Sequence, residues 1–319
     1  MLKSTANYLK SHPGYVSGEE ISKQLGLSRA AIWKHIGELR QQGYRIEAST
    51  RQGYKLVSCP DKLFPWEVQA GLGTKTFAQK VYYYETLAST MDEASRLATN
   101  AEPEGTVVFA ETQTKGRGRM GRTWNSPKGA GVYFSVILRP GLGLSEVARL
   151  TLVAAVAVCQ ALRQVSGVDA RIKWPNDILV NGRKIAGILT ELQAEMDRVK
   201  FVIMGIGINV NTTSRQLPST AVSLKMAAGR RFSRVAVAQE SLRALESWYG
   251  IFLEKGFGPV AQEWKTRTMM IGQKVIFSDG KNTFAGEAVD LADDGGLLIR
   301  LTNGDVVKKM AGDVVLAVS

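Results

Sequence analysis

The chain has 319 residues, which is too long for one small hydrophobic core and predicts two or three domains. Hydrophobic residues make up 45% of it and charged residues 22%, and these values exclude an intrinsically disordered protein. The net charge of +12 favours an anionic partner, which can be a nucleic acid, a nucleotide or an acidic protein.

The two cysteines, Cys59 and Cys159, lie far apart and form no CxxC pattern, so the sequence indicates neither a disulfide framework nor a zinc site. Cys159 ends the longest apolar run, Leu152–Cys159, which is far shorter than the roughly 20 residues that a membrane-spanning helix needs. The first residues have no signal-peptide core. We therefore expect a soluble, cytoplasmic protein without a membrane partner.

A helix, a tight turn and a second helix are predicted within the first 42 residues. Ser17 can cap the first helix, and the two acidic residues that follow the cap favour its N-terminus. Gly26 ends that helix, as the turn of a helix-turn-helix often requires. Ser28 can cap the second helix, which we expect to run from Arg29 to about Gln42.

The second helix is predicted to bind DNA. Its inner face is apolar, and the basic residues left on or near its outer face are Arg29, Lys34, His35 and Arg40. Two alternating segments in residues 44–57 predict a β-hairpin, so the domain at residues 1–60 resembles a winged helix-turn-helix. It carries nine basic and four acidic residues, a net +5 that suits a phosphate backbone. The predicted DNA-binding residues are Ser28, Arg29, Lys34 and His35. The alternative is a helical interaction module with a solvated basic helix.

Residues 58–65 contain two prolines and are predicted to be a linker before a large domain at residues 66–265. Its predicted strands cover residues 81–85, 106–111, 132–138, 170–174, 178–180, 184–192 and 199–210. Its predicted helices cover residues 91–99, 145–165 and 234–255, and Thr90 and Glu93 have capping-box spacing before the first of them. Asn181-Gly182 indicates a hairpin. Hairpins among helices favour an α+β domain with a largely antiparallel sheet.

The chemistry centres on residues 116–122, Gly-Arg-Gly-Arg-Met-Gly-Arg. These glycines match the spacing of a dinucleotide fingerprint, but such a fingerprint must open a helix, and here a Trp and a Pro follow. The chain contains no Gly-Lys-Ser/Thr, which excludes a P-loop. Arg117, Arg119 and Arg122 would repel one another without an anion, and arginine suits bidentate contacts with carboxylate and phosphate. Taken alone, the loop equally permits a second nucleic-acid contact.

Other segments of the same domain have groups suited to a ligand. Residues 173–177, Lys-Trp-Pro-Asn-Asp, place a cation, an amide and a carboxylate around a proline turn. Lys184 begins a predicted strand, and residues 204–209 contain glycines two apart, which share one strand face where a ligand can lie against the backbone. Each feature has an ordinary structural explanation, but their combination beside three arginines favours a ligand site.

These motifs resemble those of the biotin protein ligases in identity, order and spacing. The matching segments are residues 116–122 with Trp124-Asn-Ser-Pro127, then 173–177, 184–187 and 205–209. The N-terminal domain resembles that of the bifunctional repressor–ligase branch. Residues 270–319 are predicted as short strands and resemble the family's SH3-like β-barrel. The resemblance implies an α+β protein whose central domain has a class II synthetase-like fold.

The resemblance also implies roles for individual residues. Biotin would be bound by Ser89, Thr90, Gln113, Gly116, Arg117, Lys184 and Gly205. ATP would be bound by Arg119, Arg122, Trp124, Asn176, Asp177 and Asn209, with Asp177 as the ligand of Mg²⁺. The catalytic residues would be Lys184, Arg117 and Arg119. Residues 212–224, which should close over adenine, match only loosely and leave the adenine contacts open.

The family reaction has two steps. The biotin carboxylate attacks the α-phosphate of ATP to give biotinyl-adenylate, and a lysine of the biotin carboxyl carrier protein of acetyl-CoA carboxylase then attacks the adenylate. The resemblance further implies a homodimer that binds the operator DNA of biotin synthesis genes as a repressor when it holds the adenylate. Three alternatives stay open: a lipoate ligase, a ligase whose DNA-binding domain no longer regulates, and a non-catalytic ligand-sensing repressor.

Overall fold

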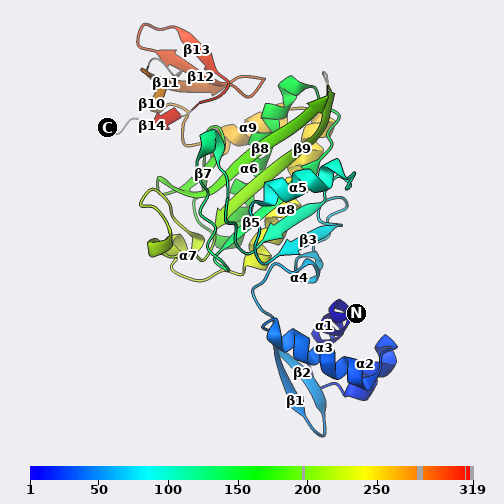
Figure 1. The fold of residues 1–319 in the computed structure, drawn as a ribbon. Coiled ribbons are helices and arrows are strands. Elements are labelled where there is room, and N and C mark those ends of the chain that lie inside the picture. Colours follow the sequence, from blue (N-terminus) through cyan, green and yellow to red (C-terminus); the bar gives the residue numbers. More distant parts are fainter. Residues whose placement is uncertain (196–197, 279–282, 313, 317–319) are drawn as a thin grey trace. The chain divides into compact units, whose positions relative to one another are not determined.

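The structure, a computed structural model, describes residues 1–195, 198–278, 283–312 and 314–316 (Figure 1). The chain divides into two compact units, Met1–Lys62 and Leu63–Ser319. The sequence predicts three domains, and the structure groups the second and third of them in one unit.

The N-terminal unit contains three helices and a hairpin: α1 (Leu2–Ser11), α2 (Gly18–Leu25), α3 (Arg29–Gln41), β1 (Arg45–Ser49) and β2 (Gly53–Ser58). The predicted caps are confirmed. Ser17 Oγ accepts a hydrogen bond from the Glu20 amide at 3.0 Å, and Ser28 Oγ accepts one from the Ala31 amide at 3.2 Å. Gly26 ends α2 in the left-handed conformation, with φ +64°.

The hairpin of this unit is joined by a third short segment. Val16 and Tyr54 exchange two backbone hydrogen bonds, of 2.9 and 2.8 Å, beside the antiparallel pair β1–β2. Gly53 has φ +97°, and a Cβ there would lie 2.1 Å from the Val16 carbonyl oxygen. Only glycine fits this position, so it fixes where the wing meets the helices.

A seven-stranded sheet forms the centre of the second unit, in the order β3-β4-β5-β9-β8-β7-β6 (Figure 1). Its strands are β3 (Val81–Tyr84), β4 (Val107–Ala110), β5 (Gly131–Leu138), β6 (Arg171–Lys173), β7 (Asp177–Val180), β8 (Arg183–Glu195) and β9 (Arg198–Asn209). β3 and β4 are parallel and every other neighbouring pair is antiparallel. The predicted largely antiparallel sheet is confirmed.

Helices cover both faces of this sheet. Because side chains alternate along a strand, Val107 and Phe109 of β4 pack into the large core with α6 (Leu144–Ser166) and α8 (Arg234–Lys255). Val108 points the other way, into a smaller core with α5 (Thr90–Thr99). β5 is buried at every position, since both faces are covered.

α6 is long and apolar enough to span a membrane by length and composition alone. Its apolar side chains, however, pack against the sheet and α8 in the large core, which is the environment of an interior helix. Cys159 lies on it, and burial raises the pKa of this thiol to about 11. The cysteine is therefore a core residue and not a reactive thiolate.

α8 fastens the first residues of the second unit, which include α4 (Pro65–Gln69). The Gln239 side-chain amide donates to the carbonyls of Glu67, Val68 and Ala70 at 3.3, 3.0 and 2.8 Å. The carboxylate of Glu246 accepts three backbone N–H groups, those of residues 75–77, each at 2.7 Å. The start of this unit is thus held by its own helix.

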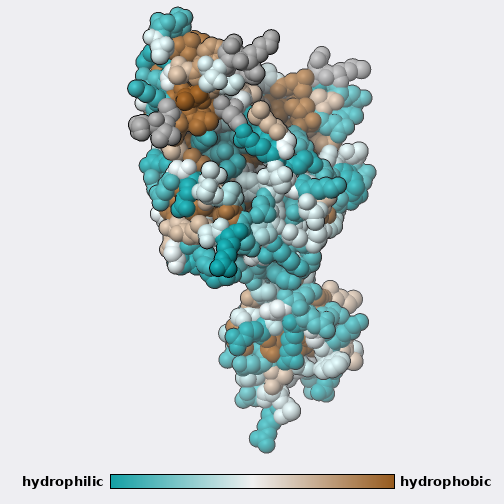
Figure 2. Space-filling view, turned by 60° about the vertical axis from the view of Figure 1, so that its left-hand side comes forward, coloured by the Kyte–Doolittle hydropathy of each residue, from teal (hydrophilic) through white to brown (hydrophobic). Residues whose placement is uncertain are grey.

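The C-terminal strands form a separate antiparallel sheet in the order β13-β12-β11-β10-β14. They are β10 (Lys274–Ser278), β11 (Thr283–Leu291), β12 (Leu297–Leu301), β13 (Val306–Lys309) and β14 (Val314–Leu316). The Trp174 indole donates to the Gly295 carbonyl at 3.0 Å, and Lys265 of α9 (Gly258–Arg267) pairs with Asp290 at 2.7 Å. These ties explain why the two parts form one unit. Figure 2 shows hydrophobic residues on the visible surface of this sheet.

The remaining short elements lie in the second unit. They are α7 (Leu224–Ala228) and two 3-10 turns, η1 (Arg119–Gly121) and η2 (Ser214–Gln216).

Candidate active site

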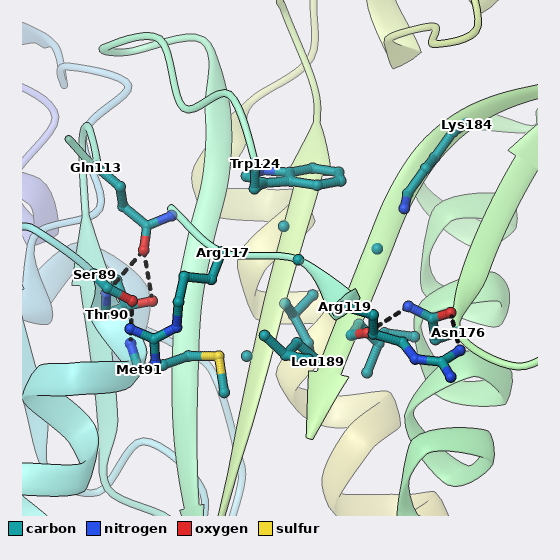
Figure 3. Close-up of a pocket in the computed structure, with 16 residues that line it drawn as sticks. Ser89, Thr90, Met91, Gln113, Arg117, Arg119, Trp124, Asn176, Lys184 and Leu189 are labelled. Atoms are coloured by element: carbon teal, nitrogen blue, oxygen red, sulfur yellow. Dashed lines mark hydrogen bonds between the residues drawn. The ribbon is translucent and has the colours of Figure 1, made fainter. Parts of the chain in front are cut away.

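A buried hydrogen-bond network holds one end of the site. The backbone amide and the hydroxyl of Thr90 donate to Gln113 Oε1 at 2.8 and 3.1 Å. The Thr90 hydroxyl accepts from Ser135 at 2.9 Å, and Gln113 Nε2 donates to the Ser126 hydroxyl at 3.0 Å. Ser89 and Thr90 are both buried. This end is therefore rigid and offers neutral donors and acceptors (Figure 3).

The expected capping box at Thr90 and Glu93 is wrong. Ser89 is the N-cap of α5, and its Oγ accepts from the Met91 amide at 3.2 Å. Glu93 instead accepts hydrogen bonds from Arg96, which lower the pKa of its carboxyl, and from Tyr84. The cap therefore lies one residue earlier than the spacing suggested, which brings Ser89 to the site.

The glycine–arginine loop folds back on itself. The Trp124 amide donates to the Gly116 carbonyl at 2.9 Å, and the Gly118 amide donates to the Arg122 carbonyl at 2.7 Å. Between these bonds the chain makes only the 3-10 turn η1, in which Met120 has φ +54°. The loop opens no α-helix, and the exclusion of a dinucleotide fingerprint is confirmed.

Arg117 pairs with two carboxylates that come from distant elements. Its guanidinium bonds Asp92 of α5, and it also lies 3.1 Å from Glu191 of β8. The hydrogen bond with Asp92 raises the pKa of Arg117, so this group stays a cation. All three side chains are partly exposed. A ligand carboxylate would therefore compete with carboxylates of the chain for this guanidinium.

Arg119 is held on the opposite side of the pocket. It donates to Asn176 Oδ1 at 3.1 Å, and Asn176 Nδ2 donates to the Ile188 carbonyl at 2.8 Å (Figure 3). The Ile188 amide donates in turn to the Asn176 carbonyl at 3.0 Å. The proline turn is thus tied to β8, and its amide orients the arginine.

Lys184 and Trp124 form a wall between these two sides. Lys184 Nζ lies 2.6 Å from Asp177 Oδ1 and 5.4 Å from the centre of the Trp124 ring. A Cβ on Gly187 or Gly207 would lie 2.9 or 2.4 Å from that indole, so the ring packs on a strip without side chains. Gly207 was predicted to admit a ligand against the backbone, and together with Gly187 it also seats Trp124.

Two pockets meet at this wall. The first has a volume of about 40 Å³ and is lined by residues that include Ser89, Thr90, Gln113, Arg117 and Gly205. The second, of about 190 Å³, is lined by residues that include Arg122, Asp177, Asn209, Leu217 and Pro218. Both are lined by Gly118, Arg119, Trp124, Asn176 and Lys184.

The structure brings the predicted ligand residues together. Of the predicted biotin residues, only Gly116 is outside the lining of the first pocket, and it lies next to Trp124 and Gln113. Every predicted ATP residue lines the second pocket. Leu217, Pro218, Thr220 and Ala221 also line it, so the loosely matching segment does reach this site. The roles of these residues stay predictions.

Sequence reasoning missed the partners of Arg117. Glu191 lies four positions after Gly187 in β8, so strand alternation placed it on the same face as the glycine strip. Asp92 lies in the first turn of α5, three residues after Ser89. Both positions could have been found once the helix and strand were accepted.

In the N-terminal unit, Ser28, Arg29 and Lys34 are exposed as predicted. His35, which was predicted to lie on or near the outer face, is half-buried, and its Nδ1 shares a hydrogen bond of 2.9 Å with Thr5 of α1. Helix α1, which was not predicted, creates this inward environment. The Arg40 guanidinium donates to the Ile46 carbonyl and fastens the hairpin. Trp33 is 73% exposed beside Lys34.

Three stretches match known families: residues 4–55 an HTH domain, 83–209 the biotin/lipoate A/B protein ligase family, and 270–317 the biotin protein ligase C terminal domain. A bifunctional ligase/repressor BirA of Bacillus subtilis (strain 168) is 45% identical over 306 residues, which are 95% of this chain and 94% of the relative. The chain belongs to the biotin protein ligase family. A family member of the same name from Escherichia coli (strain K12) is 30% identical over 94% of this chain and 92% of its own length.

A solved member of the family has a similar fold. The biotin protein ligase of Aquifex aeolicus, in complex with biotin and ATP, matches with a TM-score of 0.65 and 30% identity over 76% of this chain and 100% of its own. Together, the three family matches and the Bacillus subtilis relative cover the helix-turn-helix, the central part and the C-terminal sheet of this chain.

The site offers few groups for a metal ion. Among the described residues, no cluster of three or more His, Cys, Asp or Glu side chains could hold one. Asp177 and Asn209 both line the second pocket. The Oδ1 atom of Asn209 is buried and has no hydrogen-bond partner among the residues that the structure describes. One carboxylate with amide oxygens suits Mg²⁺, which is usually held by one or two carboxylates together with substrate phosphates.

Proposed function

We propose that this protein activates biotin with ATP and transfers it to a lysine of the biotin carboxyl carrier protein of acetyl-CoA carboxylase. The observation that carries the proposal is the wall shared by the two pockets, with Arg119, Trp124, Asn176 and Lys184. A carboxylate in the first pocket and a triphosphate in the second would meet at Lys184. That geometry fits an acyl-adenylate reaction.

In the first step a biotin carboxylate oxygen attacks the α-phosphorus of ATP, and pyrophosphate leaves. This step brings one anion onto another, so Lys184 and Arg119 supply the positive charge that offsets their repulsion and stabilises the transition state. In the second step the amine of the carrier lysine attacks the acyl carbon, loses a proton, and AMP leaves. Arg117 and its loop cover the adenylate and exclude water between the steps.

Magnesium fits the second pocket. Asp177 would hold the ion with the phosphates of ATP, and the unpartnered oxygen of Asn209 supplies a further acceptor among the described residues. When bound, Mg²⁺ would neutralise charge on the triphosphate. Lys184 pairs with Asp177 at 2.6 Å and lines both pockets, so it would also face the biotin carboxylate.

The N-terminal unit would make the protein a transcriptional repressor as well. The exposed Arg29 and Lys34 on α3 and the net +5 of residues 1–60 support contact with DNA phosphates. The adenylate-bound protein would form a homodimer on the operator of biotin synthesis genes, in the cytoplasm. A ligase whose DNA-binding domain no longer regulates is the alternative.

The test is biotin-dependent exchange between ATP and pyrophosphate, with lipoate as a parallel substrate. Exchange with biotin alone supports the proposal, whereas exchange with lipoate alone favours a lipoate ligase. No exchange with either acid, in folded protein with Mg²⁺, would leave a ligand-sensing repressor. DNA affinity that does not change with biotin and ATP would contradict regulation but leave the ligase intact.

A further inference from the structure

A buried ion pair lies outside the linings of both pockets. Glu111, just after β4, and Arg234, the first residue of α8, are 1% and 2% exposed, and Arg234 Nη1 lies 2.6 Å from Glu111 Oε2. Arg234 also donates to the Gly131 carbonyl at 3.3 Å. Burying two charges is costly unless their remaining hydrogen-bonding atoms are also used. Glu111 and Arg234 therefore depend on the hydrogen bonds that their remaining atoms make, and these bonds connect the pair to other segments of the unit.

The second oxygen of Glu111 holds the start of the catalytic unit. Glu111 Oε1 accepts the backbone N–H of Leu63 at 3.2 Å. Leu63 is the first residue of this unit, directly after Lys62, which ends the N-terminal unit. One carboxylate thus binds α8 with one oxygen and the entry point of the chain with the other.

Glu111 also belongs to the segment that supports the predicted biotin end of the site. Its amide donates to the Tyr84 carbonyl at 3.0 Å, and its carbonyl accepts from Gly129 at 3.3 Å. Thr112 then donates to the Ser126 carbonyl at 2.6 Å, and Gln113 follows. Glu111, Thr112 and Gln113 each make a hydrogen bond of their own to the rest of this unit. We therefore expect that a displacement of Glu111 also displaces the side-chain amide of Gln113, two residues further along the chain.

We propose that Glu111 is a positioning residue that holds the biotin-contacting Gln113 and the chain entry at Leu63 on one buried support, with Arg234 as its counter-charge. The inference rests on the proposed biotin site. Biotin that fixes Gln113 then also slows local opening at Leu63, and the effect is reciprocal, because coupling between two sites acts equally in both directions.

The test compares Glu111→Gln with a matched control, Glu246→Gln. Glu111→Gln keeps the shape of the side chain and removes its charge. Glu246 is also a carboxylate that fastens the start of this unit, but it accepts the amides of residues 75–77. Both variants weaken the same segment, and only the first disturbs the strand that leads to Gln113. Thermal unfolding establishes that each is folded.

Two readouts are expected to separate the variants. By calorimetry, Glu111→Gln should raise the Kd for biotin about tenfold, whereas Glu246→Gln should leave it within about twofold. The turnover of pyrophosphate exchange at saturating biotin should stay within about threefold of wild type in both, since neither residue lines either of the two pockets of the site. Trypsin cleavage between Lys62 and Leu63 should be slowed by biotin in wild type and in Glu246→Gln, but not in Glu111→Gln.

Wild-type biotin affinity and ligand protection in Glu111→Gln would overturn the inference, as would an equal loss in Glu246→Gln. Should Glu111→Gln fail to fold, Glu111→Asp, which keeps the charge but is shorter by one methylene, is read in the same assays. Its unchanged affinity and protection would likewise overturn the inference. Failure of the wild type to bind biotin would instead contradict the proposed function, so the two failures are distinguishable.

Discussion

The neutral and the charged groups of the site are held in different ways. Around Thr90 and Gln113 the polar atoms are buried and bonded to neutral partners within the chain. The cations of Arg117, which lines the same pocket, and of Lys184, in the shared wall, are partly exposed and pair with the protein's own carboxylates. A neutral ring can be recognised by groups already in place, whereas anions must displace resident carboxylates. The neutral groups are thus suited to selecting a ligand, and the charged groups to stabilising charge as it develops.

Lys184→Gln should have the largest effect, because it removes the cation shared by both pockets. We expect pyrophosphate exchange to fall by at least about 100-fold, the loss typical of removing one electrostatic contact to a transition state. Lys128→Gln is the control, since Lys128 is 62% exposed and outside both pockets. If the rate of pyrophosphate exchange falls by less than tenfold, Lys184 is not one of the charged groups that stabilise the transition state.

Gln113→Leu tests the neutral hydrogen-bonding groups around Thr90 and Gln113. It leaves the Thr90 donors and the Ser126 hydroxyl without their partner, and a buried group left unsatisfied costs about 1–3 kcal/mol. Biotin affinity should therefore fall roughly tenfold to 100-fold, with little change in turnover at saturating biotin. If turnover falls as much as affinity, the division between selection and catalysis is wrong.

Arg117→Ala tests whether the charged loop also shields the adenylate. We expect weaker biotin binding and release of biotinyl-adenylate roughly ten times faster, followed by measuring free adenylate after a chase. Arg117→Lys should restore only part of the retention, because lysine keeps the charge but loses the bidentate contact. Normal retention in Arg117→Ala would refute the shielding role.

Asp92→Asn with Glu191→Gln frees Arg117 from its resident carboxylates. Both pairs are partly exposed, and such pairs contribute less than about 1 kcal/mol each. Biotin affinity should therefore rise by no more than about 30-fold, the limit for the two pairs together. A decrease, measured by calorimetry, would mean that these carboxylates orient the arginine and do not compete with the ligand.

The C-terminal sheet allows the contribution of a partly exposed ion pair to the stability of the fold to be tested by itself. The hydrogen bond from Lys265 lowers the pKa of Asp290, so this pair stabilises the fold above the ordinary Asp pKa of about 3.9 and loses that contribution as the pH falls through the lowered pKa. Both side chains are over a third exposed, so the effect is below about 1 kcal/mol. Wild type should lose protection from hydrogen exchange in the sheet as the pH falls below about 4, and Asp290→Asn should not show this loss.

Local rules predicted the elements whose causes are local. Ser17 and Ser28 cap helices by bonds three residues along, and the glycine–arginine loop fails to form a helix. Helix α1 was missed because Met1 gives it no side-chain cap. Helix α9 was also missed, although Pro259 stands in its first turn, where proline is favoured.

Long-range partners could not be predicted in this way. Arg117 meets Asp92 and Glu191 only because α5 covers the face of the sheet on which Leu189 and Glu191 of β8 lie. Glu111 read as the polar end of a strand, and nothing near it in sequence indicated Arg234. The resemblance placed the ligand residues, but ion pairs within the chain follow from packing that no short motif encodes.

The fastening of residues 63–77 by α8 also bears on how such proteins evolve. Gln239 and Glu246 hold this segment from within the catalytic unit. A gene fusion or truncation at the junction after Lys62 would therefore leave these fastenings intact. The N-terminal unit is exchangeable in this sense.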